Sequence, residues 1–444
     1  MSRYLNLRDR FGLDYPDGLT FGRLPEPDLA LPKDDVARLR ALGRRKKEYA
    51  ENPVMDERRA RWRAANDLHM TKPPIFVDEI CWTEFKDPAL NLACVHPFAR
   101  ELEDLLLKEL YCLDHALYDQ VAEPFIENPL VVYDSGFGID EVVDTRSTQF
   151  NSEIVSRHFH TLINGMDDIE KIREPEVALD MERTKQYGEL LSSIFDGILP
   201  VVTVGARGLW FTPWDYLIRV MGVDQTFVNL YDEPEFVEAV VRRYVDMAMI
   251  RMEKYRALGI WASNNSPVRV GSGGYGLVSA LDAQELYPYN CPAKHMWGCG
   301  NAQIFSSVSP AMHWQFSLQY EMDWLKQFGL TYYGCCEPLS GKMDLMDRIP
   351  NLRKVSMSPW NNFEAAAERC RGKYVMSCKP SPAVFAGDSF DEDEARRAIL
   401  AILNATKGCS IELVMKDIST LRFKPERLHA WAKVARETVD NYFA

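Results

Sequence analysis

Two adjacent cysteines and a glutamate directly follow a short apolar run. Residues 330–334 have the composition of a β-strand, and Cys335, Cys336 and Glu337 come next, before Pro338 prevents the strand from continuing. Thiolates bind soft or borderline metal ions, and a carboxylate beside them is a further ligand or a proton carrier. Because side chains alternate across a strand, we expect the two thiols to point to opposite sides. Burial of both cysteines as small apolar core residues is the alternative interpretation.

Two other pairs could act in catalysis. His158 and His160 share one face of the chain if the backbone is extended there, and two imidazoles can bind a metal or a carboxylate substrate. A structural or surface pair is the alternative. Lys416 and Asp417 close the last apolar run, where they form either a salt bridge or part of a site.

Polar and aromatic side chains also gather where other apolar runs end. These ends carry further candidates for catalysis and binding, namely Asp78, Asp134, Asn264 and Lys379. Trp210 and Trp214 follow residues 199–205, and aromatic side chains often line a ligand pocket. Core packing explains the two tryptophans equally well.

Residues 271–276 read Gly-Ser-Gly-Gly-Tyr-Gly, which formally matches the pattern of a dinucleotide-binding loop. That function also needs a longer preceding strand and an acidic residue about twenty positions later, and neither is suitably placed. We expect a flexible loop over the mouth of a barrel instead.

Composition limits the class of protein. The chain has 444 residues, 46% of them hydrophobic, and a net charge of −13. An acidic chain argues against nucleic acid or an anionic membrane as the main partner. No apolar run has the length of a membrane helix and no signal segment opens the chain, so we expect a cytoplasmic protein with reduced cysteines.

From residue 74 onward, apolar runs alternate with helical patterns. Eight runs are candidate strands, and most have the β-branched and aromatic character of buried strands: residues 74–80, 129–134, 199–205, 259–264, 330–336, 352–358, 374–378 and 409–415. Helical patterns include residues 234–258, 312–328, 363–371 and 391–406. This alternation predicts an α/β fold, a (β/α)8 TIM-like barrel over residues 74–444, with a doubly wound sheet as the alternative. The active site of such a barrel lies at the carboxyl ends of the strands, where the candidate residues fall.

Residues 1–73 form a predicted N-terminal extension. Residues 1–32 show no clear period, whereas residues 33–66 have a charged helical pattern with 11 Lys or Arg against 6 Asp or Glu. The basic excess indicates either a solvated helix face or a docking arm for an acidic partner or a second subunit.

Several motifs in the chain resemble one known group. Residues 309–310 (Ser-Pro), 316–320 (Phe-Ser-Leu-Gln-Tyr), Gly329 and the strand leading to Cys336 are similar to the uroporphyrinogen decarboxylase-like superfamily, most of all to its cobalamin-linked methyltransferases. Further support comes from residues 167–171, Gly205, and residues 350–352 and 381–382. The resemblance covers about residues 74–440. It implies a distorted (β/α)8 barrel and a homodimer.

The same resemblance implies a zinc site. Methyltransferases of this superfamily hold zinc with a His-x-Cys pair and a Cys after the last strand. Here Cys336 matches the first Cys, while Gly334 stands at the His position and Asp417 at that of the last Cys. The implied ligands are therefore Cys336, Glu337 and Asp417, with His160 as an additional one. Zinc accepts carboxylate and imidazole ligands as well as thiolates.

The implied function is transfer of a methyl group between a small methoxy, methylthio or thiol compound and the cobalt of a corrinoid. A partner protein would carry the corrinoid, since this chain has no Asp-x-His-x-x-Gly segment. Zinc would polarise the oxygen or sulfur that loses or receives the methyl group. The expected catalytic residues are Glu337, His160, Asp78 and Asp134, and the expected substrate-binding residues are Trp210, Trp214, Asn264 and Lys379.

Two alternatives stay open. A metal-independent decarboxylase or lyase would need a basic pocket, to which Lys379, Lys416 and Arg207 are the obvious contributors. Residues 74–82 carry acids where the superfamily's decarboxylases have propionate-binding arginines, which argues against a tetrapyrrole substrate. A non-catalytic ligand-binding protein is the other alternative.

Overall fold

A parallel sheet forms the centre of the molecule. The computed structural model describes residues 30–139, 141–147, 155–208 and 210–444. Seven strands pair in the order β1-β13-β12-β11-β10-β9-β8, and every pair is parallel. Their bounds are β1 Ile75–Val77, β8 Trp210–Phe211, β9 Trp297–Gly300, β10 Leu330–Tyr333, β11 Leu352–Met357, β12 Val375–Cys378 and β13 Ile411–Met415.

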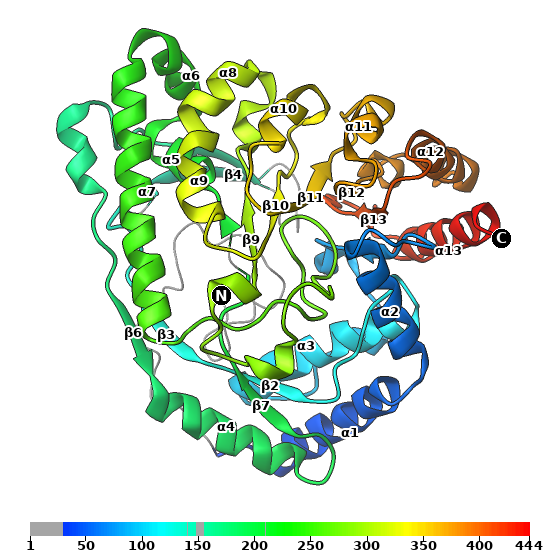
Figure 1. Cartoon of the computed structure of the whole chain (residues 1–444). Coiled ribbons are helices and arrows are strands. Elements are labelled where there is room, and N and C mark those ends of the chain that lie inside the picture. Colours follow the sequence, from blue (N-terminus) through cyan, green and yellow to red (C-terminus); the bar gives the residue numbers. More distant parts are fainter. Residues whose placement is uncertain (1–29, 140, 148–154, 209) are drawn as a thin grey trace.

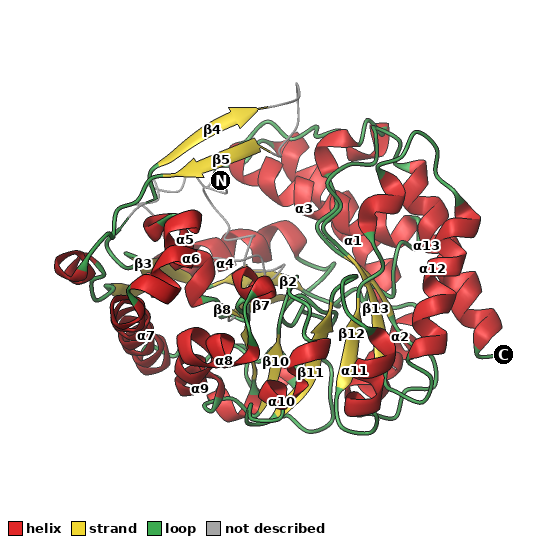
Figure 2. Cartoon of the chain, turned by 90° about the horizontal axis from the view of Figure 1, so that it is seen from above, coloured by secondary structure: helices red, strands yellow, loops and turns green. Residues whose placement is uncertain are grey.

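The remaining strands form three small sheets. Strand β2 (Ile126–Pro129) pairs in parallel with β7 (Val201–Val204), and β3 (Val131–Asp134) pairs antiparallel with β6 (Val177–Asp180). Strands β4 and β5 form an antiparallel ribbon, Val143–Ser147 with Val155–Phe159, that stands off the body in Figure 2. Among the described strands, no ladder joins β2 and β7 to the central sheet. The α/β class is confirmed, whereas closure of a barrel stays a prediction.

Helices surround the strands, as Figure 1 shows. Along β13, Ile411, Leu413 and Met415 belong to the main hydrophobic core, whereas Val414 packs in a separate cluster on the other face of the strand. No described helix has the length and apolar character needed to cross a membrane. The described α-helices are α1 Lys33–Ala50, α2 Val54–Asn66, α3 Pro97–Asp114, α4 Met181–Phe195, α5 Pro213–Met221, α6 Val223–Asp232, α7 Pro234–Ala257, α8 Pro310–His313, α9 Gln319–Leu325, α10 Met343–Met346, α11 Phe363–Cys370, α12 Glu392–Ala405 and α13 Glu426–Tyr442.

Six of the eight predicted strands are confirmed as strands, namely β1, β7, β10, β11, β12 and β13. The run 259–264 is not a strand and makes only an isolated bridge, from Trp261 to Ala206. The run 129–134 covers the last residue of β2 and then β3, which lies outside the central sheet. Strand β9 was not predicted because its sequence, Trp-Gly-Cys-Gly, contains two residues of low strand propensity.

A long coil lies inside the molecule. Residues 262–278 have almost no regular structure, yet all of them except Pro267 are buried. Figure 1 shows this yellow-green segment in the middle of the view, between the sheet and α2. Gly271 has a φ of +58°, and a Cβ at that position would overlap the ring of Tyr332 in β10. The expectation of a flexible loop over a barrel mouth is therefore wrong, because the glycines allow the coil to pack against aromatic rings.

The predicted charged helix consists of two helices that pack on the body. Leu39 and Leu42 of α1 are buried in a cluster with residues of α3 and α4, and Trp62 of α2 is buried against the coil. The basic side chains pair with acids of the body, including Arg38 with Glu103, Lys46 with Glu109 and Arg61 with Asp119. Residues 1–29 of the predicted extension lie outside the described residues.

Candidate active site

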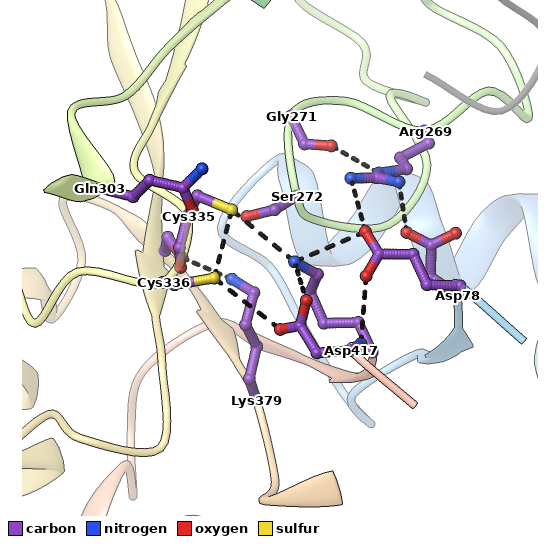
Figure 3. A network of polar contacts seen from close by, with 12 residues as sticks. Asp78, Arg269, Gly271, Ser272, Gln303, Cys335, Cys336, Lys379 and Asp417 are labelled. Atoms are coloured by element: carbon purple, nitrogen blue, oxygen red, sulfur yellow. Dashed lines mark hydrogen bonds and ion pairs between the residues drawn. The ribbon is translucent and has the colours of Figure 1, made fainter. Parts of the chain in front are cut away.

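Strand β10 ends one residue before a glycine that redirects the chain. Gly334 has a φ of +99°, which side-chain-bearing residues rarely adopt, and a Cβ there would lie 3.0 Å from Cβ of Ser356. After this turn the Sγ atoms of Cys335 and Cys336 are 3.6 Å apart (Figure 3). The expectation that the thiols point to opposite sides is wrong, because alternation holds only while a strand continues.

The two thiols differ in exposure and acidity. Cys335 is buried and Cys336 is partly exposed. The hydrogen bond that the Cys335 thiol donates lowers the pKa of Cys336, burial opposes this, and the Lys416 ammonium lowers that pKa further. The same hydrogen bond, together with burial, raises the pKa of Cys335 well above its usual range. When the pair ionises, the negative charge therefore resides on Cys336.

Lys416, directly after β13, holds its ammonium group among acids and a thiol. Its Nζ lies 3.0 Å from Asp417 Oδ1, 3.6 Å from Glu79 Oε1 and 3.7 Å from Cys335 Sγ. Burial alone would lower the pKa of Lys416, but these neighbours raise it well above its usual value. The lysine is therefore protonated at neutral pH. Because β13 pairs with β1, Asp417 meets Glu79, and its N–H donates to Glu79 Oε2 at 3.2 Å.

Asp78 and Glu79, which follow β1, bind an arginine of the buried coil. Arg269 Nη1 lies 2.5 Å from Asp78 Oδ2, and Nη2 lies 3.7 Å from Glu79 Oε1. The Arg269 guanidinium also lies 5.7 Å from the ring centre of Trp210. Burial raises the pKa of Glu79 to about 7, although the nearby lysine counteracts this. Glu79 can therefore hold or release a proton near neutral pH.

Lys379 is the second lysine of the site. It follows β12 and is only 2% exposed. Its amine donates to the hydroxyls of Ser356, at 2.5 Å, and Tyr332, at 3.3 Å. The Tyr332 hydroxyl in turn lies 2.9 Å from the hydroxyl of Ser272 in the coil. Figure 3 shows the Lys379 amine pointing toward Cys336, so a second positive group faces the thiol pair.

Glu337, one of the predicted metal ligands, has other hydrogen-bond partners. It is fully buried, and its carboxylate accepts hydrogen bonds from the backbone N–H groups of Cys335, at 2.9 Å, and Ala302, at 3.3 Å. Burial raises the pKa of Glu337. The other two predicted ligands do approach each other, with Cys336 Sγ 3.8 Å from Asp417 Oδ2. Only two members of the predicted set therefore come together.

This arrangement does not fit zinc. In the part of the chain that the structure describes, no three His, Cys, Asp or Glu side chains are grouped so that they could hold a metal ion. The Lys416 ammonium already lies close to donor atoms of Asp417, Glu79 and Cys335, and it would repel a metal cation placed there. The chain thus supplies a positive charge of its own where the resemblance implies a metal.

His160 and Asp134 lie in other environments. His160 follows β5 on the projecting ribbon, is largely exposed, and has its Nε2 2.9 Å from Asp144 Oδ2. Asp134 is fully buried at the end of β3, where it accepts hydrogen bonds from the Tyr255 hydroxyl, at 2.6 Å, and the Gly136 N–H, at 2.8 Å. Neither set of contacts includes a residue of the network around Lys416.

Trp214 and Asn264 stabilise the core. Trp214 is fully buried in α5 and donates its indole N–H to the Phe316 carbonyl at 2.9 Å. Asn264 is buried and exchanges two hydrogen bonds with the backbone of Trp297, which holds the coil to β9. Of the predicted substrate-binding residues, only Trp210 and Lys379 contact residues of the site.

Arg269 and Ser272 are site residues that were not predicted from the sequence. Both lie in the coil, and Gly271 between them accepts a hydrogen bond from Arg269 Nε at 2.7 Å. The available signal was the glycine-rich run itself, because a coil packed closely against rings needs residues without a Cβ.

Comparisons with known proteins assign no family. No protein-family model matches the sequence, and no curated protein matches it. The chain is similar to the solved structure of a methyltransferase from Methanosarcina mazei, with 10% identity and a TM-score of 0.45 over 87% of this chain and 99% of that one. A likeness of this strength carries no argument about the fold or the activity.

Proposed function

We propose that this chain is a methyltransferase that moves a methyl group between a small methoxy or methylthio compound and a corrinoid carried by a partner protein. The sequence resemblance suggests the reaction. The observation that carries the proposal is the position of the Lys416 ammonium, beside Glu79, Asp417 and the thiol pair. These groups lie at the carboxyl ends of parallel strands, where α/β folds commonly hold their active sites.

Demethylation of an ether or thioether leaves negative charge on oxygen or sulfur, and a catalyst must neutralise it. As the methyl group passes to the corrinoid, both electrons of the broken C–O or C–S bond stay on the oxygen or sulfur. Lys416 would stabilise the developing anion, and Glu79, with a pKa of about 7, would donate the proton that completes the product. Asp417 and Arg269 hold these two groups in place. No step requires a zinc ion.

The test is methylation of free cob(I)alamin from a panel of methoxy and methylthio compounds. Because an acid or charge acting on the leaving atom contributes about 10²-fold or more, Lys416→Met should lower the rate by at least about that factor. Lys416→Arg keeps the charge and should retain more activity. Lys433→Met, on the exposed side of α13, is the matched control and should match the wild type.

Unchanged turnover in a folded Lys416→Met protein, with folding checked by circular dichroism, would refute the role of this lysine. Metal content provides an independent check. The result that would contradict the Lys416 mechanism is one zinc per chain in the wild type, lost in Cys336→Ala together with turnover. That result would favour the zinc mechanism that the resemblance implies.

Lys379 favours a second candidate, a metal-independent decarboxylase. Its buried amine bonds to hydroxyls, so its charge is available to a carboxylate substrate. Arg207, another expected contributor to a basic pocket, pairs with Glu127 at 2.6 Å. Release of CO2 from small carboxylic acids, abolished in Lys379→Met and without cobalamin methylation, would favour this candidate.

A further inference from the structure

The Cys335–Cys336 pair is distinct among the ten cysteines. Of the other eight, seven are buried and one, Cys81, is partly exposed. In the pair, a partly exposed thiol lies 3.6 Å from a buried thiol of the neighbouring residue. Such a pair combines access for a small reagent with a second thiol that is already in contact.

Two lysines and one aspartate lie around the pair, with Asp417 Oδ2 3.8 Å from Cys336 Sγ. The Lys416 ammonium lies 3.7 Å from Cys335 Sγ, and the Lys379 amine points toward Cys336 in Figure 3. Partly exposed thiols in positive surroundings are the ones that react with oxidants, whereas buried structural thiols are inert. The surroundings therefore favour Cys336 as the first sulfur to react.

The two cysteines lie outside the strand and take no part in the hydrogen bonds that pair β10 with its neighbours. Strand β10 ends at Tyr333, and residues 335–337 form a bend after Gly334. Because neighbouring Cα atoms are closer than disulfides usually allow, an S–S bond here would distort the bend between the two residues, and not the pairing of β10 with β9 or β11.

We propose that Cys335 and Cys336 form a peroxide-sensitive dithiol, with Cys336 as the attacking residue and Cys335 as the resolving residue. First, the Cys336 sulfur attacks one oxygen of hydrogen peroxide, the O–O bond breaks, and a sulfenic acid forms as the leaving hydroxide takes up the Cys336 proton to become water. Next, the Cys335 sulfur attacks the Cys336 sulfur, so that an S–S bond forms and the S–O bond breaks. Water leaves with the Cys335 proton, and two electrons have passed from the thiols to the peroxide.

This site of reversible oxidation does not depend on the proposed methyl transfer. Its readout is the mass of one peptide, so an absence of methyltransferase activity would leave it unaffected. Trypsin should release residues 327–342, which contain these two cysteines and no others, by cleavage after Lys326 and Lys342.

The experiment treats the full chain with hydrogen peroxide, blocks the remaining thiols with iodoacetamide, and analyses this peptide by mass spectrometry. The wild-type peptide should lose two hydrogen atoms and escape alkylation, and dithiothreitol should reverse both changes. In Cys335→Ser the Cys336 sulfenic acid should persist and react with dimedone. In Cys336→Ser the peptide should stay reduced, and Cys81→Ser should respond like the wild type.

Three outcomes would overturn the proposal. One is a wild-type peptide that stays reduced when Cys81 has already reacted. Another is direct oxidation of Cys336 to the sulfinic acid while Cys335 stays free. The third is a disulfide between either residue and a different cysteine. Far-UV circular dichroism of each variant establishes that the comparison concerns folded proteins.

Discussion

At the scale of single residues, the electrostatics of the site depend on Lys416. Lys416 is 3% exposed, and its ammonium offsets the charges of Asp417 and Glu79. Removing one partner of a buried ion pair leaves the other charge uncompensated, at a typical cost of about 3–5 kcal/mol. Any loss of activity in Lys416→Met must therefore be measured well below the unfolding transition of that variant.

Glu79 should give the free energy of unfolding a distinct pH dependence. Its pKa is about 7 in the folded protein, against an ordinary value of 4.5. Below pH 4.5 the carboxyl is protonated in both states and contributes nothing. Between these values the unfolded chain releases the proton before the folded protein does. The free energy of unfolding should therefore fall by at most about 3 kcal/mol as pH rises through this window, and stay level above it.

The measurement is urea unfolding at a series of pH values. Glu79→Gln cannot ionise, so its free energy of unfolding should lack this part of the decline. Glu235→Gln, at an exposed position on α7, should follow the wild type. Identical pH profiles for Glu79→Gln and the wild type would show that Glu79 does not retain its proton in the folded protein.

Some site residues could be predicted from the sequence because each follows directly after a strand of the central sheet. Asp417 and Cys336 each follow a strand of one parallel sheet, and their side chains meet at 3.8 Å. Glu337 was misplaced because backbone N–H groups next to it capture its carboxylate. Arg269 was missed because it lies in a coil, whose path no periodicity reveals.

At the scale of elements, the buried coil depends on Gly271. An alanine there would adopt a φ of +58° and would overlap the ring of Tyr332. We expect Gly271→Ala to lower the free energy of unfolding by about 2–4 kcal/mol, from strain plus overpacking. Gly341→Ala meets nothing within 4 Å and should change it by less than about 0.5 kcal/mol. Equal stabilities of the two variants in urea unfolding would contradict this role for Gly271.

The strands differ in how readily the sequence reveals them. Residues 352–358 and 409–415 were recognised from their buried apolar residues, although each run also holds one buried charge, Lys354 or Glu412, and these two pair at 2.7 Å. Strand β9 was hidden because close packing against Phe328 requires a glycine at position 298. A position selected for the absence of a side chain gives no hydrophobic signal.

At the scale of the whole molecule, α1 and α2 belong to the same folded body as the sheet. Trp62 is fully buried, its ring centre lies 5.1 Å from that of Tyr275, and its indole N–H donates to the Asp119 carbonyl at 2.8 Å. The alternation of runs could predict the central α/β body, but the charged pattern of residues 33–66 gave no indication of how deeply Trp62 would be buried.

We therefore expect Trp62→Ala to lower the free energy of unfolding of the whole protein by about 3–5 kcal/mol, in a single transition. Glu57→Ala, on the exposed side of α2, is the control and should have little effect. The same transition should appear in tryptophan fluorescence and in circular dichroism. Separate transitions, or an unchanged midpoint, would instead indicate that the helices form an independently docked arm.

The hydrogen bond from the Gly274 N–H to Glu412 Oε1, at 2.9 Å, spans 138 positions of the chain. During synthesis the coil therefore leaves the ribosome long before β13, the strand that carries Glu412. Closing so long a loop costs entropy that is recovered only when the final strand arrives, so this part of the molecule is assembled last. Until then Cys335 and Cys336, already synthesised, lack the Lys416 ammonium. The nascent chain thus passes through an interval in which this thiol pair is present without the lysine that lies 3.7 Å from it in the folded protein.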